Sequence, residues 1–285
     1  MIWPTSLIRE LAERRCIIFL GAGASAGSVS SLDRKVRPPT WRQLLLNLIG
    51  RMRTTDTDVA TKLVDEGKYL EAAEVIVADV SPADLTAFVR DTFVNPRFLP
   101  SDIHKVVLQI DPKVTITTNY DDIYDIYCRS GMAAEGYNVA KYYDTHLVSD
   151  LRSPVRSIVK AHGCVSDPSK IVLTRSQYFA QRRDHENFFR VLDALFLTNS
   201  LFFIGYSLGD PDIQLVLENA AIAAPVTHPH YAVVGDAVPP ALKRSWSLAY
   251  NIEFLEYPEG DYSTLNEQLD DLVSLVTEFR ERNRQ

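Results

Sequence analysis

Cysteine is scarce in this chain, and its scarcity narrows the chemistry that the protein can use. The 285 residues include three cysteines, Cys16, Cys128 and Cys164, which lie far apart in the sequence. A disulfide framework needs cysteines in pairs, and a zinc ribbon needs Cys-x-x-Cys ligand pairs. We therefore expect no disulfides and no metal site, zinc included, which is typical of proteins in a reducing compartment.

Long apolar runs and an excess of positive charge are also missing. No apolar run approaches the roughly 18 residues that a membrane-spanning helix needs, and the N-terminus lacks the basic and apolar regions of a signal peptide. The net charge is -7, from 30 basic and 37 acidic residues. A general nucleic-acid surface would need a basic patch. These absences favour a cytoplasmic protein without a membrane segment or an evident nucleic-acid surface.

The most informative stretch runs from Cys16 to Gly27 and reads Cys-Ile-Ile-Phe-Leu-Gly-Ala-Gly-Ala-Ser-Ala-Gly. The apolar residues 16–20 predict a buried parallel strand. Gly21 suits a tight turn, and Gly23 lets a ligand approach the backbone because it has no Cβ. Free N–H groups at such a turn bind phosphate. The alternative is an ordinary glycine turn between a strand and a helix.

One feature argues against an ordinary dehydrogenase half-domain. The dinucleotide fingerprint places an acidic residue about 20 residues after its glycines, whereas Asp33 comes too early. Residues 40–110 instead show helical periodicity, in segments near 40–53, 56–67, 69–79, 82–93 and 101–110. Thr40 suits the N-cap of the first of these helices. The block predicts a helical insertion that covers the glycine loop.

The second half alternates strands with helices. Strands are expected at 114–118, 157–160, 171–173, 201–204, 231–234 and 252–255, and helices at 120–129, 175–182, 185–198, 211–223, 239–248 and 262–281. A further helix is expected at 5–14. This alternation predicts an α/β fold, in which helices cover both faces of a mostly parallel sheet. We expect residues 1–285 to form one domain with the helical insertion.

Small and polar residues follow the predicted strands, where ligands bind parallel sheets. They are Gly21, Gly23 and Ser25, then Thr117-Thr-Asn-Tyr-Asp121, Lys160-Ala-His-Gly163, Gly205-Tyr-Ser-Leu-Gly-Asp210 and Gly235-Asp236. Taken singly, each has a structural alternative. Asn119 and Asp210 suit helix N-caps, and a lone histidine such as His162 is more often structural than catalytic. Their joint occurrence favours a ligand site.

The order of these motifs resembles the sirtuin-like family, in its bacterial silent-information-regulator-two-like branch. The motifs are Gly-Ala-Gly-x-Ser, Thr-Thr-Asn-Tyr-Asp, His-Gly and Gly-Tyr-Ser-Leu, in that order. Pro39-Thr-Trp41 and Ile171-Val-Leu-Thr174 are also typical of that branch. The resemblance extends from about residue 15 to 235.

The resemblance implies a Rossmann-like domain that binds NAD and breaks its nicotinamide–ribose bond. Gly21, Ala22, Gly23 and Ser25 match the loop that holds the pyrophosphate. Asn119 and Asp121, which follow Thr118 of the same cofactor-binding motif, match the pair beside the nicotinamide ribose. His162 matches the catalytic histidine, with Asn119 as the other catalytic residue, and Gly205 and Ser207 match the adenosine-side segment.

The chain also departs from the deacylating members of that family. They carry a zinc ribbon on four paired cysteines, and helices replace the expected acyl-peptide groove here. Water is therefore favoured as the acceptor, which makes NAD the substrate of a hydrolase that yields nicotinamide and ADP-ribose. In this branch the reaction commonly serves abortive anti-phage defence.

Such an enzyme must be kept silent in the uninfected cell. About 50 residues follow the last motif, too few for a sensor domain. We therefore expect a homo-oligomer and regulation in trans by a partner such as an ATPase encoded nearby. Two alternatives stay open: a non-catalytic NAD or ADP-ribose sensor, and a metal-independent deacylase or ADP-ribosyl transferase.

Overall fold

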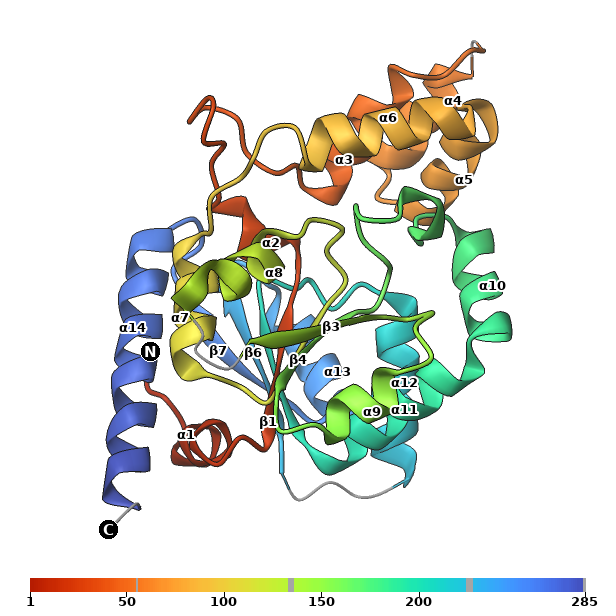
Figure 1. Cartoon of the computed structure of the whole chain (residues 1–285). Helices are drawn as coiled ribbons and strands as arrows, with labels where there is room; N and C mark the ends of the chain where they lie inside the picture. The colour runs from red at the N-terminus through yellow and green to blue at the C-terminus, as the bar shows by residue number, and fades with distance from the viewer. Residues whose placement is uncertain (55, 133–135, 224–227, 284–285) are drawn as a thin grey trace.

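Seven parallel strands form one sheet in the computed structural model (Figure 1), which describes residues 1–54, 56–132, 136–223 and 228–283. The order across the sheet is β3-β4-β2-β1-β5-β6-β7. The strands are β1 (Cys16–Leu20), β2 (Val114–Thr117), β3 (Tyr137–Lys141), β4 (Arg156–Lys160), β5 (Ser200–Ile204), β6 (His230–Gly235) and β7 (Ile252–Tyr257). The α/β, Rossmann-like prediction is confirmed.

The central strand β1 is buried on both faces of the sheet. Ile17 and Phe19 point into one core, while Ile18 and Leu20 point into the other. Such alternation suits a strand of continuous apolar residues, because both faces are covered by helices. Its neighbours are β2 and β5, which lie far from it in the sequence.

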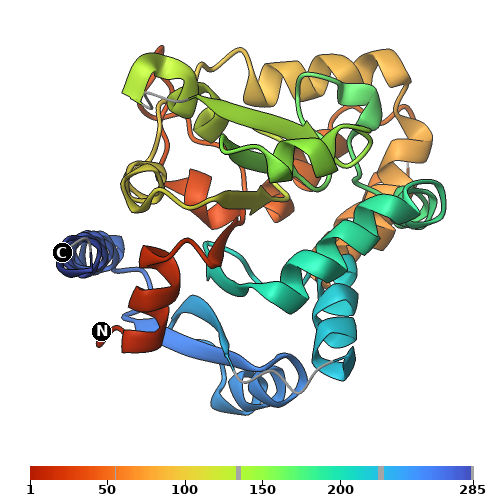
Figure 2. The same cartoon turned by 60° about the horizontal axis from the view of Figure 1, so that its bottom comes forward.

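Helices cover each face of this sheet. One face carries α1 (Thr5–Ala12), α7 (Asp102–Ile110) and α14 (Tyr262–Arg282), and Figure 2 shows α1 beside the C-terminal α14. The opposite core takes residues from α9 (Leu147–Arg152), α10 (Arg175–Asp184), α11 (Glu186–Thr198), α12 (Pro211–Ala223) and α13 (Pro240–Tyr250). Among the described residues, no helix combines the length and apolar character required to cross a membrane.

Four helices form a separate block beyond the sheet (Figure 1). They are α3 (Trp41–Ile49), α4 (Thr57–Asp65), α5 (Tyr69–Asp79) and α6 (Pro82–Phe93). Thr40 and Gln43 form a capping box at the start of α3, as the sequence predicts for Thr40. The helical block, as we call α3–α6, shares a core with Val165, Ile171 and Leu173 of the sheet domain. The segment 101–110, predicted within the same block, instead packs on the sheet as α7.

Three local expectations are corrected. Residues 171–173 form no strand: Ile171 and Leu173 are buried against the helical block, Val172 is buried in a core of the sheet, and its N–H donates to the His162 carbonyl at 3.0 Å. The edge strand β3 was missed because most of its side chains are only half-buried, so it lacks a continuous apolar run. The predicted helix 120–129 begins later, as α8 (Ile123–Tyr127), and continues as the π-helical turn η1 (Cys128–Met132).

Candidate active site

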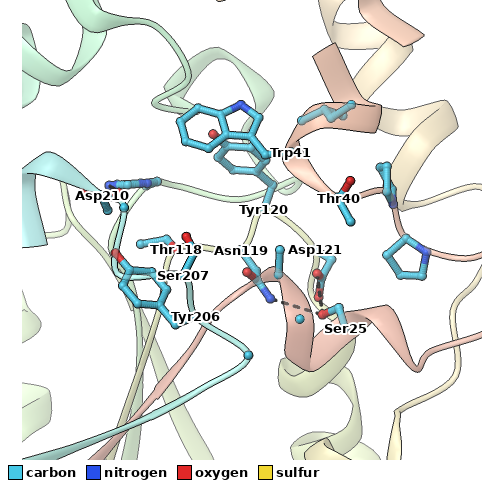
Figure 3. A pocket seen from close by; sticks show the side chains of 18 of the residues that line it. Ser25, Thr40, Trp41, Thr118, Asn119, Tyr120, Asp121, Tyr206, Ser207 and Asp210 are labelled. Atoms are coloured by element: carbon cyan, nitrogen blue, oxygen red, sulfur yellow. Dashed lines mark hydrogen bonds and ion pairs between the residues drawn. The ribbon is translucent and has the colours of Figure 1, made fainter. Parts of the chain in front are cut away.

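A cavity of about 480 Å³ lies between the carboxyl ends of the strands and the helical block (Figure 3). This volume falls within the range of about 300–1,000 Å³ that is typical of small-molecule sites. Segments that follow β1, β2, β4 and β5 all contribute to its walls. The predicted site residues that line it are Ala22, Gly23, Ser25, Thr118, Asn119, Asp121, His162, Gly205 and Ser207.

A chain of hydrogen bonds joins the glycine loop to the residues after β2. Asn119 Nδ2 donates to the Gly21 carbonyl at 3.0 Å and to Ser25 Oγ at 3.2 Å. Ser25 Oγ in turn donates to Asp121 Oδ2 at 2.9 Å (Figure 3). Asp121 Oδ1 accepts the N–H of Ile123, the first residue of α8, at 3.2 Å. Asn119 therefore caps no helix, and its amide nitrogen anchors it to the β1 loop.

The glycines bring two backbone segments into direct contact. A Cβ on Gly23 would lie 2.8 Å from Gly205 Cα, and Gly205 itself has φ +64°. The N–H groups of Gly21 and Gly23 donate to the carbonyls of Ile204 and Gly205 at 3.1 and 2.8 Å. The expectation of free N–H groups is therefore wrong for these two residues. Both glycines allow close approach of the loops that follow β1 and β5. Gly21 is not among the residues that line the cavity, and its carbonyl supports Asn119.

A second cluster surrounds His162 on the other side of the cavity. Its Nε2 lies 3.3 Å from Asp210 Oδ2, and its Nδ1 lies 3.4 Å from the Tyr178 hydroxyl oxygen. Tyr178 donates its hydroxyl proton to Asp210 Oδ2 at 2.8 Å. Asp210 Oδ1 accepts the N–H groups of Asp212 and Ile213. Asp210 is thus both the predicted N-cap of α12 and the partner of His162.

Burial controls the charge state of His162. The side chain is buried, and burial lowers its pKa, although the neighbouring Asp210 acts in the opposite direction. A histidine with a lowered pKa is neutral at neutral pH and can accept a proton.

The buried ammonium group of Lys160 holds the segment that carries Asp121. Lys160, at the end of β4, donates its Nζ to the Asp121 carbonyl and lies 3.4 Å from Asp125 Oδ2. Its side chain is 1% exposed. A buried ammonium group needs such partners, because burial alone favours its neutral form. The Lys160 contact therefore ties the end of β4 to the segment that carries Asn119.

The helical block supplies a wall that sequence reasoning missed. Thr40, Trp41 and Leu44 of α3 and its cap line the cavity, together with Tyr69 and Phe93. Trp41 and Tyr69 pack ring against ring, with centroids 5.9 Å apart. The Pro39-Thr-Trp41 motif was the available signal, but the strand-end rule does not select residues from an insertion.

In the part of the chain that the structure describes, the cavity is lined by no lysine or arginine and carries the carboxylates of Asp121 and Asp210. Within the described residues, no group of three or more His, Cys, Asp or Glu side chains is placed to hold a metal ion. The three cysteines are buried and unpaired. The side chains that line the cavity therefore offer an amide, an imidazole, two carboxylates and aromatic rings for binding and catalysis.

Comparison with known proteins supports the resemblance to bacterial sirtuin-like proteins. The NAD(+) hydrolase ThsA of Acinetobacter baumannii is 26% identical over 219 residues, which are 76% of this chain and 41% of that protein. The NAD(+) hydrolase ThsA of Bacillus cereus is 23% identical over 217 residues, 75% of this chain and 42% of that protein. Defense-associated sirtuin 2 of Bacillus subtilis is 27% identical over 121 residues, 40% of this chain and 11% of that protein.

The chain thus spans about two fifths of the length of these ThsA proteins. A family model described as a SIR2-like domain matches residues 113–255. That range holds Asn119, His162 and Asp210, which line the cavity. On this evidence the chain belongs to the SIR2-like family.

Proposed function

We propose that the protein hydrolyses NAD⁺ at its nicotinamide–ribose bond. The observation that carries the proposal is the shared cavity: Asn119 and His162 come from segments far apart in the sequence and line the same site. The named activity of the ThsA relatives, which match about three quarters of this chain, supports the same reaction.

The reaction needs a site for a positively charged ribose. The bond between C1′ and the pyridinium nitrogen breaks, and its electron pair leaves with neutral nicotinamide. Water then adds to C1′ and loses one proton, which gives ADP-ribose. Enzymes stabilise such transition states with dipoles and charges that are already oriented.

Asn119 can contact the ribose or the attacking water through its side-chain oxygen. Its Nδ2 is held by the Gly21 carbonyl and by Ser25 Oγ. The side-chain oxygen Oδ1 is left to face the ligand, where it accepts a hydrogen bond from a ribose hydroxyl or from the attacking water. We propose that Ser25 and Asp121 fix this orientation.

His162 is proposed as the proton acceptor. Its lowered pKa keeps the ring neutral in the resting site. When the ring takes a proton from a ribose hydroxyl or from water, Asp210 at 3.3 Å stabilises the imidazolium ion that forms. Tyr178 holds the same carboxylate in place.

The test measures nicotinamide and ADP-ribose released from NAD⁺ by the purified protein, alone and with candidate partner proteins. Asn119→Ala and His162→Ala should each reduce kcat at least about 100-fold, as expected for loss of a transition-state contact. Asn95→Ala and His146→Ala, which change the same residue types outside the cavity, should keep full activity. Full activity in the first pair would contradict the assignment. Tight NAD⁺ binding without turnover, both alone and with every candidate partner protein, would indicate a binding module.

We further propose that this activity serves anti-phage defence in the cytoplasm and that a partner controls it in trans. The similarity to a protein named defense-associated sirtuin 2 supports a role in defence. Cells that carry the natural gene should resist phage, and cells with Asn119→Ala should not. Light scattering of the purified protein tests the proposed homo-oligomer.

A further inference from the structure

Two buried titratable residues, Lys160 and His162, lie close together in the sequence at the end of β4. His162 lines the cavity, whereas Lys160 is not among the residues that line it. The Lys160 ammonium group donates to the backbone carbonyl of Asp121, and it lies 3.4 and 3.5 Å from the two carboxylate oxygens of Asp125. The proposed reaction uses His162 to accept a proton, but it leaves the buried ammonium group without a role.

Lys160 keeps its charge although its side chain is buried. Burial lowers the pKa of Lys160, but the carboxylates of Asp125 and Asp121 raise it, and the resulting pKa lies above its ordinary value. Both ions of a buried pair lose their water, so such a pair is often no more stabilising than two well-packed apolar side chains. Stability alone therefore gives no reason for an ammonium group at this position.

The backbone carbonyl of Asp121 is the contact that leads toward the cavity. In the described part of the chain, no hydrogen bond to this carbonyl is found other than the one from Lys160. The Asp121 side chain accepts the Ser25 hydroxyl, and Ser25 Oγ accepts the Asn119 amide (Figure 3). A shift of the Asp121 backbone therefore displaces the partner of Ser25, and Ser25 in turn displaces Asn119.

The strand end that carries His162 also pairs with β2. Thr117, the partner of Lys160 in the sheet, accepts the Ala161 N–H through its carbonyl at 2.9 Å. The Thr117 hydroxyl oxygen accepts the Asn119 N–H at 3.0 Å. The Lys160 side chain adds a further contact to these backbone contacts. The end of β4 therefore holds the imidazole through the chain itself and the amide through the Lys160 side chain.

We propose that Lys160 is a positioning residue: its ammonium group fixes the Asp121 backbone and thereby the orientation of the Asn119 amide. This inference rests on the proposed function and deepens it, because catalysis then depends on a charge that lies outside the cavity lining. Loss of that charge should lower kcat and kcat/KM for NAD⁺ by the same factor, since Asn119 is proposed to stabilise the transition state.

The test separates the two contacts of Lys160. Lys160→Met alone would leave the Asp125 carboxylate buried without its partner, which is strongly destabilising. The comparison therefore takes Asp125→Asn as the reference and Lys160→Met/Asp125→Asn as the double variant, since both lack that carboxylate. Thermal unfolding checks that both are folded. If the double variant is not, Lys160→Met/Asp125→Leu replaces it, because an apolar pair is well tolerated at buried sites.

The double variant should have a kcat about 10- to 100-fold below that of Asp125→Asn, with a similar KM, as expected for a displaced catalytic group. An equal kcat in the two variants would overturn the inference, because Lys160 would then serve only its pair with Asp125.

A double-mutant cycle shows whether Lys160 acts through Asn119. In an Asn119→Ala background, the loss of kcat caused by Lys160→Met should largely disappear, since the amide that Lys160 positions is already gone. A loss by the same factor in both backgrounds would mean that Lys160 has a purely structural role, which contradicts the inference.

The side-chain amide of Asn119 gives a second measurement, which needs no turnover. Its ¹H–¹⁵N signals are identified by their loss in Asn119→Ala. This amide donates to the Gly21 carbonyl and to Ser25 Oγ. Its exchange with solvent should therefore be about tenfold faster in the double variant than in Asp125→Asn.

The two measurements keep this inference separate from the proposed hydrolase activity. NAD⁺ turnover by the natural protein, with equal amide exchange in both variants, would leave the hydrolase and remove the role of Lys160. Faster exchange in the double variant, without NAD⁺ turnover by the natural protein alone or with any candidate partner, would leave the positioning role and remove the hydrolase.

Discussion

At the scale of single residues, the structure decides between alternatives that the sequence left open. Asn119 was compatible with an N-cap, but its amide bonds to Gly21 and Ser25 instead. Asp210 was compatible with an N-cap and serves as one, yet it also contacts His162. No local pattern predicts the second role, because Tyr178, Asp210 and His162 meet only through tertiary packing.

Gly205 offers a prediction at this scale. Its φ of +64° disfavours any side chain, and an added Cβ would lie 2.6 Å from the Gly23 carbonyl carbon. Gly260 has a similar φ of +81° but open space around it. Gly260→Ala should cost about 1–2 kcal/mol and lower the Tm by a few degrees.

Gly205→Ala should lower the Tm further and remove NAD⁺ binding, because the β1 and β5 loops must separate. Thermal unfolding of the two variants provides the comparison. Equal losses would mean that backbone conformation matters at Gly205 and close contact does not.

At the scale of elements, strands were predictable where their residues form a continuous apolar run. The buried strands β1, β2 and β5 were readable because each is a run of apolar or β-branched residues. Edge strand β3 was not, since its burial is partial. The run 171–173 looked like a strand although its burial has another cause: Ile171 and Leu173 contact the helical block, and Val172 packs in a core of the sheet. Apolar runs report burial directly and strand pairing only indirectly.

Two buried histidines, His104 of α7 and His230 of β6, should make the stability of the fold sensitive to acid. His104 Nδ1 accepts the Ser101 N–H at the start of α7, and His230 Nδ1 accepts the Leu201 N–H of β5, both at 3.1 Å. Burial lowers the pKa of each to about 4. Between pH 6.5 and 4 the unfolded chain binds protons that the native chain does not, so stability falls as the pH falls.

Each histidine should reduce the free energy of unfolding by about 2 kcal/mol at pH 5 relative to pH 7. His104→Gln tests this directly. Glutamine completes the same capping box, as Gln43 and Gln177 do in α3 and α10, but it does not titrate. Urea unfolding at pH 7 and pH 5 should show a smaller acid loss in His104→Gln than in the natural protein. If both proteins lose the same free energy of unfolding between pH 7 and pH 5, His104 does not contribute to the acid sensitivity.

At the scale of the whole molecule, the sequence indicated an α/β sheet and a helical insertion over the glycine loop, but not the order of the strands or the contacts of the insertion. Strand order depends on which face of the sheet each connecting helix covers. A buried apolar residue such as Ile17 or Phe202 does not show which strand lies next to its own. The place of the helical block depends on contacts with residues such as Val165 and Leu173, which lie far along the chain. The Pro39-Thr-Trp41 motif marked this segment, but its place in the cavity wall depends on these contacts.

The contact between the helical block and α10 yields a prediction. Glu74 of α5 accepts the Ser176 N–H at 3.0 Å and its hydroxyl at 2.7 Å. Because α10 carries Tyr178, this contact links both walls of the cavity. Glu74→Ala should raise the KM for NAD⁺ several-fold with a smaller change in kcat, since two bonds to a carboxylate are lost.

Steady-state kinetics on Glu74→Ala and Glu278→Ala provide the measurement. Glu278 pairs with Arg282 on the exposed face of α14 and serves as the matched control. If both variants keep the natural KM, the helical block does not depend on Glu74 for its position.

The position of β1 between β2 and β5 has a consequence for protein synthesis. The first strand emerges from the ribosome early, but β5 and Asp210 follow nearly two hundred residues later. Because chains are made from the N-terminus, a growing polypeptide has no complete site for NAD⁺. By the proposed function, a nascent chain cannot hydrolyse NAD⁺ before translation has passed the second half of the sheet, whatever the state of the partner that controls the finished enzyme.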